Sequence, residues 1–175
     1  VRLADWVYRR LSRLSRSQRM KMWGLYIAGE FGGMNEVMAK LYRITGKEDY
    51  LSCARMFDND KLFAPLLLGK DALGGLHANQ HIPQIIGALE IFLVSGEKRY
   101  LIIASRFWKY VTTGNIYAPG GLGERELLRD RGVVRGFVTA NNQQTCASGS
   151  LLHPKRPLLD VGPGRPSSVY YSQPT

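Results

Sequence analysis

The sequence predicts an all-α fold built from helical hairpins, and a repeat with an offset of 50 residues is the main observation behind this prediction. Segment 41–51, LYRITGKEDYL, returns as segment 91–101, IFLVSGEKRYL. Ala54 and Phe57 return at the same offset as Ala104 and Phe107. A fixed offset with conservative replacements indicates one repeated structural unit.

Each unit has the pattern of two helices joined at a glycine. The apolar helix before Gly46 is expected to end there, because glycine takes the left-handed conformation that closes a helix. The apolar side chains of the second helix recur at helical spacing and form one stripe: Tyr50, Leu51, Ala54 and Phe57. Since one hairpin cannot bury this stripe alone, we expect neighbouring hairpins to stack or to close into a ring.

The positive charge is concentrated at the start of the chain. Residues 1–23 carry seven Arg and Lys side chains against Asp5, which accounts for +6 of the net charge of +10. Leu3, Trp6, Val7, Leu11 and Leu14 share one face, so an amphipathic basic helix is predicted. It fits a solvated outer helix of the core, an Arg-rich organelle presequence, or a nucleic-acid or membrane-surface arm. No other nucleic-acid-binding pattern follows, and we expect neither nucleic acid nor a membrane as partner.

Composition sets further bounds on the class of protein. A chain of 175 residues with 45% apolar side chains can form one domain with a real core. No run approaches the roughly 18 apolar residues of a membrane span. Cys53 and Cys146 are too few for a disulfide scaffold, so the compartment stays undetermined. Cys53 is expected in the core, since it lies between Leu51 and Ala54 on a helix.

Two polar clusters precede predicted helices. Glycines gather before Asn35 and Glu36, which indicates either a crowded helix junction or a rim that faces a ligand. Segment 77–81, HANQH, follows a connection over residues 58–75 and opens the next apolar helix. Imidazole and amide groups donate and accept hydrogen bonds, so His77, Asn79 and Gln80 suit a polyhydroxylated ligand. Helix capping and buried hydrogen bonding are the alternative.

Metal binding by the pair of histidines in this segment is not expected. His77 and His81 are four residues apart, as in a zincin, but Ala78 stands where that motif has its catalytic glutamate.

The glycine-rich segment 117–126 lacks the Gly-Lys-Ser/Thr of a phosphate loop but carries Glu124 and Glu126. Loops on a rigid helical scaffold are common positions for catalytic acids. Two solvated glutamates beside Arg125 and Arg129 are the alternative. Beyond Gly149 the composition changes: five of the eight prolines fall in the last 27 residues, and we expect an extended or disordered tail there.

Several motifs occur together in an order that resembles the β-L-arabinofuranosidase-like proteins of glycoside hydrolase family 127. They are EFGGMNEV at 30–37, the Thr-Gly-x-x-x-Tyr-Leu hairpin, GLHAN at 75–79, Ile82-Pro83, segment 117–126 and TCAS at 145–148. The resemblance runs from about residue 4 to 148. It implies an α/α toroid of six helical hairpins and hydrolysis of glycosidic bonds with retention. We therefore expect a partial toroid over 1–148 and a divergent tail over 149–175.

The resemblance also implies roles for particular residues. In that family a zinc-bound cysteine thiolate is the nucleophile and a glutamate is the acid/base. Glu126 matches the acid/base position, with Glu124 in reserve, and His77 matches a histidine of the sugar pocket. Cys146 matches a zinc ligand. Gln144 stands where the family has a zinc-ligand glutamate, and a neutral amide is a poorer ligand.

These matches predict a glycoside hydrolase-like protein for β-L-arabinofuranosides or related plant glycans. The family's nucleophile lies beyond the last residue here, so we hypothesise a truncated or frame-shifted chain with weak or no activity. Its uncovered helical faces would favour self-association. The alternative is a non-catalytic carbohydrate-binding or oligomer-forming helical-hairpin protein.

Overall fold

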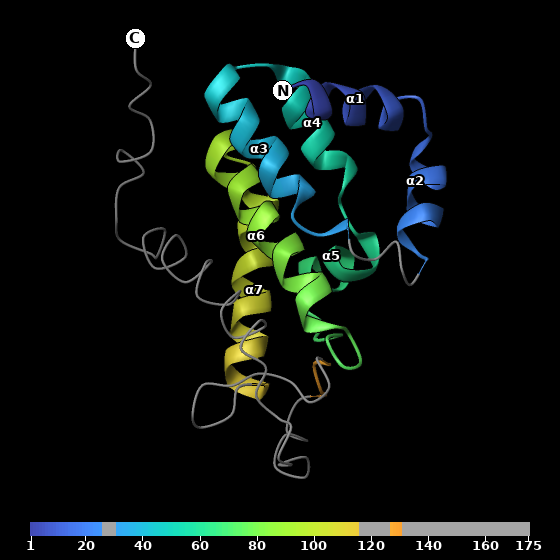
Figure 1. Cartoon of the computed structure of the whole chain (residues 1–175). Coiled ribbons are helices and arrows are strands. Elements are labelled where there is room, and N and C mark those ends of the chain that lie inside the picture. The colour runs from blue at the N-terminus through green and yellow to red at the C-terminus, as the bar shows by residue number, and fades with distance from the viewer. Residues whose placement is uncertain (26–30, 116–126, 131–175) are drawn as a thin grey trace.

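The computed structural model describes residues 1–25, 31–115 and 127–130, and the regular elements among them are helices (Figure 1). They form α1 (Arg2–Leu11), α2 (Arg16–Trp23), α3 (Met34–Thr45), α4 (Glu48–Met56), α5 (Asp60–Leu67), α6 (Ala78–Ser95) and α7 (Lys98–Gly114). Within the described ranges the one strand-like pairing is an isolated bridge between His77 and Leu127. The predicted all-α class is confirmed.

The repeat forms two hairpins, α3 with α4 and α6 with α7. Gly46 and Gly96 close the first helix of each hairpin with φ of 68° and 72°, in the left-handed region. The Gly46 N–H donates to the Tyr42 carbonyl at 2.7 Å, and the Gly96 N–H donates to the Phe92 carbonyl at 2.8 Å. The two turns are therefore equivalent bond for bond, as the sequence repeat predicts.

The equivalence extends to the tyrosine that follows each glycine. The Tyr50 hydroxyl donates to the Asp5 carboxylate of α1 at 2.8 Å. The Tyr100 hydroxyl donates to the Asp58 carboxylate, in the segment before α5, at 2.9 Å. Both tyrosine side chains are buried. Each hairpin is thus attached through its second helix to an element that precedes it in the chain.

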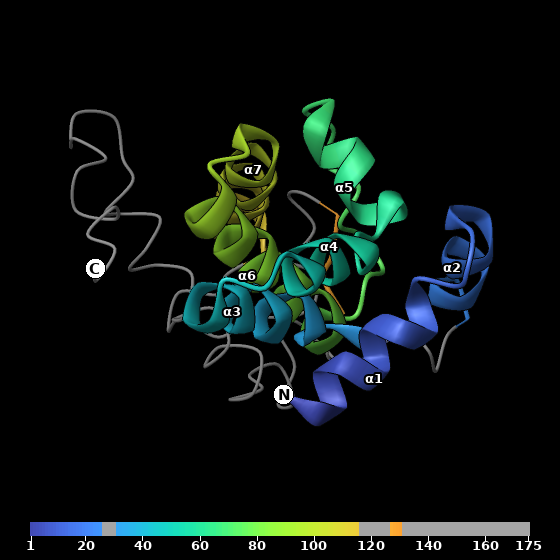
Figure 2. The same ribbon diagram turned by 90° about the horizontal axis from the view of Figure 1, so that it is seen from above.

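Helices α3 and α6 lie side by side with the same direction, while α4 and α7 return alongside them (Figures 1 and 2). Helix α1 packs against α4, and α5 packs against α7. Small residues on the facing helices let the backbones approach closely. The fully buried residues at these contacts include Met38, Ala39, Cys53, Ala54, Ala88, Ile91, Ala104 and Phe107. The core therefore lies between the two hairpins, and Cys53 belongs to it as predicted.

The basic N-terminal segment is two helices, not the single helix expected from its apolar face. Ser15 caps α2: its hydroxyl accepts from the Gln18 N–H, and the Gln18 side chain accepts from the Ser15 N–H. This capping box starts a new helix and breaks the old one. Leu11 is buried against the core, whereas Trp6 keeps 49% of its surface exposed, so α1 is an outer helix. Among the described helices, none is long and apolar enough to cross a membrane.

The segment expected as a connection over residues 58–75 contains α5, which the sequence reading missed. Leu62, Phe63 and Leu66 are buried on one face of this helix, so packing stabilises it. Pro65 lies near the C-terminal end of α5. Because proline has no N–H, the helix lacks one hydrogen bond, the one that residue 65 would donate to the Lys61 carbonyl. The helix then ends within two residues of Pro65.

Replacing Gly46 tests the left-handed turn. A Cβ at Gly46 meets no atom within 4 Å, so the cost of Gly46→Ala is backbone strain alone. We expect the free energy of unfolding to fall by about 1 kcal/mol. Gly46→Asn should cost less, because asparagine tolerates the left-handed region. Denaturant unfolding of both variants would contradict the assignment if alanine and asparagine cost the same.

Asp58 is an unusual buried carboxylate in this fold. Its side chain is 17% exposed, and burial raises its pKa to about 6 from the ordinary 3.8, against the opposing effects of Arg99 and Tyr100. The native state therefore holds this proton more tightly than the unfolded chain does. The charged form costs roughly 3 kcal/mol above pH 6, and this cost disappears as the pH falls toward 4.

Asp58→Asn isolates this effect, because asparagine can still accept the Tyr100 hydroxyl. We expect the variant to be more stable than the parent chain at pH 8 and to lose that advantage between pH 6 and pH 4. The free energy of unfolding of both proteins is measured by denaturation across this pH range. Other carboxylates contribute equally to both proteins, so their contribution cancels in the difference. An advantage that grows as the pH falls would contradict the raised pKa.

Candidate functional site

The N-terminal ends of α3 and α6 bring the predicted sugar-binding residues to one end of the hairpin pair. His77 is the residue before the first turn of α6, and Asn35 lies in the first turn of α3. The Asn35 Nδ2 donates to the Gln84 carbonyl of α6 at 2.9 Å. This bond fixes the two helix starts against each other. The place where they meet is called the polar mouth below, with the residues Asn35, Glu36, His77, Asn79 and Gln80.

Asn35 fits against α6 because residue 87 has no side chain. A Cβ at Gly87 would lie 2.0 Å from the Asn35 Cγ, far inside contact distance. Asn35 itself is 1% exposed, and its Oδ1 accepts the Glu36 N–H at 3.0 Å. Its amide therefore serves a structural purpose in holding α3 on α6, which matches the alternative of a crowded helix junction for this residue.

A chain of amide groups continues inward from Asn35. The Gln84 Nε2 donates to the Gln80 carbonyl at 2.9 Å, and the Asn59 Nδ2 donates to the Gln84 Oε1 at 3.0 Å. Buried amides of this kind hold a unique arrangement only when they are paired. The sequence reading missed Gln84 and Asn59. The sequence did offer a signal for Gln84, because it is a polar residue within the apolar run of α6. In the structure this side chain is 1% exposed.

Pro83 changes the hydrogen bonding of the first turns of α6. Proline has no N–H, so the carbonyl of Asn79, four residues earlier, receives no helical bond from residue 83. Asn79 is partly exposed, as is His77. Both side chains can donate and accept hydrogen bonds, and solvent reaches part of each.

His77 also contacts the segment that follows the predicted catalytic loop. Two backbone bonds join the segments, from the Gly75 N–H to the Leu128 carbonyl and from the Leu128 N–H to the Leu76 carbonyl, both at 2.8 Å. Leu128 is fully buried, which anchors the pairing. The structure therefore places Leu127 directly beside His77 at the start of α6 (Figure 1).

His81 faces back toward the start of the helix. Its Nδ1 lies 2.7 Å from the His77 carbonyl, and burial lowers its pKa, so its ring stays neutral near pH 7. Burial raises the pKa of the Cys53 thiol to about 12, which leaves it protonated and unsuited to metal binding. Over the described ranges, no group of three or more His, Cys, Asp or Glu is arranged to hold a metal ion.

Four predicted site residues lie outside the described residues: Glu124, Glu126, Gln144 and Cys146. The same holds for the predicted tail over 149–175. Their roles, and the domain boundary at 148, remain predictions.

The fold and the site together define a helical-hairpin protein with imidazole and amide groups at one end of α3 and α6. A family model described as "Beta-L-arabinofuranosidase, GH127 catalytic domain" matches residues 1–171. The chain belongs to this family of glycoside hydrolase catalytic domains, which confirms the resemblance seen in the motifs. No curated protein is similar enough to the chain to count as a match.

A double-mutant cycle tests the contact between Asn35 and Gly87. Gly87→Ala should lower the free energy of unfolding by about 2–3 kcal/mol, because the new methyl group overlaps the Asn35 amide. Asn35→Ala removes that overlap, so the double variant should be more stable than the sum of the single changes predicts. Additive losses in denaturant unfolding would mean that the two residues do not touch.

Proposed function

We propose that this chain is a glycosidase domain that acts on β-L-arabinofuranosides or related plant glycans, and that the sugar binds at the polar mouth. The observation that carries the proposal is the pairing of His77 with Leu127, which joins the two parts of the sequence that match the family's sugar pocket and acid/base loop. Family membership supplies the reaction class.

The polar groups at the mouth suit a sugar ring. Each hydroxyl of a furanose donates one hydrogen bond and accepts others, and imidazole and amide groups do the same. His77 and Asn79 are partly exposed, so a ligand can reach them. In this proposal Asn35 acts as a positioning residue that holds α3, and with it Glu36, against α6.

Glu126 is the proposed general acid/base. It lies outside the described residues, and in the sequence it directly precedes Leu127, the residue that pairs with His77. A carboxylic acid there protonates the oxygen of the leaving group and afterwards, as carboxylate, accepts a proton from water. Glu124 is the reserve for this role.

Zinc is proposed on the family resemblance. The metal would keep a cysteine thiol deprotonated at neutral pH, and Cys146 would be one of its ligands. Gln144 fits less well, since a neutral amide is a weaker zinc ligand than a carboxylate. Metal analysis of the purified chain, compared with Cys146→Ser, tests this ligand directly: we expect less bound zinc in the variant.

A second candidate function is carbohydrate binding without catalysis. Gln144 favours it, because this replacement weakens the predicted metal site and leaves the polar mouth intact. Sugar binding at the mouth with no bond cleavage, under any metal condition, would identify this alternative.

Aryl glycosides, including β-L-arabinofuranosides, test the proposed activity on the full chain with and without added zinc. We expect at most weak release of the aryl group from the arabinofuranoside, because Gln144 weakens the predicted zinc site. Glu126→Gln should lower kcat by about 10²–10⁴-fold with little change in sugar affinity, because a general acid/base acts in the transition state.

Glu124→Gln is the matched control, since it removes a carboxylate from the same segment. It should leave kcat close to that of the parent chain. A loss confined to Glu124→Gln would move the role to the reserve residue. Full activity of both variants would contradict a carboxylate acid/base in this loop.

A further inference from the structure

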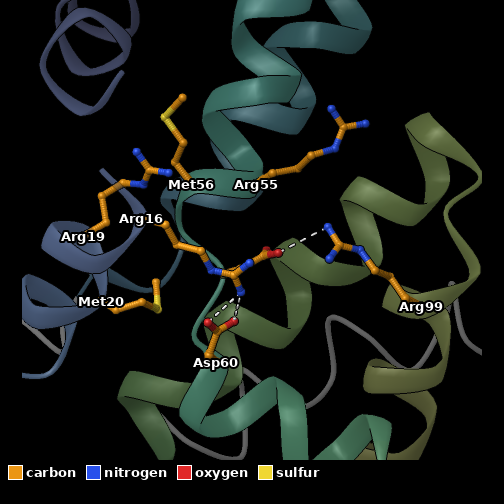
Figure 3. Close-up of a pocket in the computed structure, with 8 residues that line it drawn as sticks. Arg16, Arg19, Met20, Arg55, Met56, Asp60 and Arg99 are labelled. Carbon is orange, nitrogen blue, oxygen red and sulfur yellow. Dashed lines mark hydrogen bonds and ion pairs between the residues drawn. The ribbon is translucent and has the colours of Figure 1, made fainter. Parts of the chain in front are cut away.

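A concave site lies between α2, α4, α5 and α7 and shares no residue with the polar mouth (Figure 3). It is a cavity of about 200 Å³. Its walls are formed by Arg16, Arg19, Met20, Arg55, Met56, Asp58, Asp60 and Arg99. In Figure 3 Arg16 and Arg99 approach the centre of the cavity from opposite sides, and Arg19 lies beside Arg16.

The charges on these walls are unbalanced. Four guanidinium groups from three helices face two carboxylates, which leaves a net charge of +2. Arg16 binds Asp60 at 2.7 Å, and Arg99 lies 3.4 Å from Asp58. Glu97, outside the cavity, binds Arg55 at 2.6 Å and reduces the net charge of the whole cluster to +1. Positive charge therefore remains after every carboxylate of the cluster is counted.

Arg19 carries the charge that no carboxylate balances among the described residues. Its Nη1 donates to the Leu14 carbonyl and to the Leu11 carbonyl, the latter at 3.2 Å. These are neutral main-chain acceptors, and they hold the half-buried guanidinium in place at the cavity wall. A guanidinium has five N–H donors in a rigid plane, so other N–H groups of Arg19 remain that can bind a ligand.

We propose that this cavity binds a small oxyanion, supplied either by the carboxylate of an acidic sugar or by a phosphate. Arginine binds both through paired, charge-assisted hydrogen bonds, and its planar fork matches their oxygens. Ion pairs and bonds to main-chain carbonyls hold these guanidinium groups in position before the ligand arrives. A volume of about 200 Å³ equals that of roughly seven waters, which is room for either group.

The negative charge of Asp58 weakens the binding of an anion, so a variant that removes this charge should bind the anion more tightly. Its carboxylate lies on the cavity wall, where it repels a negative ligand and occupies Arg99. Asp58→Asn removes that charge and leaves Glu97, at 3.2 Å, as the carboxylate that Arg99 contacts. A purely structural role for the cluster predicts no gain in anion binding from this change.

The first experiment is calorimetric titration of the full chain at low ionic strength with inorganic phosphate, D-galacturonate and neutral D-galactose. We expect saturable binding of at least one of the two anions and none of galactose. The anion that binds identifies the source of the oxyanion. Absence of saturable binding for both anions, or equal binding of galactose, would overturn the proposal.

Two arginine variants separate ligand binding from structure. Arg19→Gln should weaken anion binding at least tenfold. Arg106→Gln is the matched control, because Arg106 also donates to two main-chain carbonyls, those of Leu66 at 2.8 Å and Leu67 at 2.6 Å, but lies outside the cavity. It should change the affinity by less than twofold. Equal losses in both variants, or no loss in Arg19→Gln, would contradict the site.

If Arg19→Gln fails to fold, Asp58→Asn decides the question. It should bind the anion several-fold more tightly than the parent chain at pH 8. Unchanged or weaker binding would overturn the proposal.

Discussion

The arrangement of this protein depends on a glycine turn in the left-handed conformation, made twice with the same hydrogen bonds. Gly46 and Gly96 reverse the chain within two residues, so the helix that follows must run back along the one before it. Antiparallel helices at such short range bury their apolar stripes against each other. The core between the two hairpins, with fully buried Ala54 and Ala104, is the direct result.

The same turns determine where chemistry can occur. Because both turns lie at the same end of the hairpin pair, α3 and α6 begin together at the opposite end (Figure 1). Asn35 then locks the two helix starts through Gln84, and the absence of a side chain at Gly87 allows this contact. Rigid helix ends of this kind can hold imidazole and amide groups in fixed positions for a sugar ring.

The sequence predicted local features well and features formed by distant residues poorly. The repeat and its glycines predicted both hairpins, because helix periodicity and left-handed closure act over a few residues. The break at Ser15 was hidden by apolar residues on both sides of it, and α5 was hidden by Pro65. The amide chain through Gln84 and the arginine cavity join residues far apart in the sequence, so only packing shows them. The roles of Glu126 and Cys146 remain predictions.

The tyrosine that follows each glycine turn has an evolutionary consequence. Tyr50 reaches back to Asp5, and Tyr100 reaches back to Asp58, so each hairpin contains the means of its own attachment to what came earlier. The attachment needs one acidic group on the receiving segment and nothing from the segments that come later. Tandem duplication of such a unit adds a hairpin together with the tyrosine that attaches it. This is a simple route by which a helical array can grow.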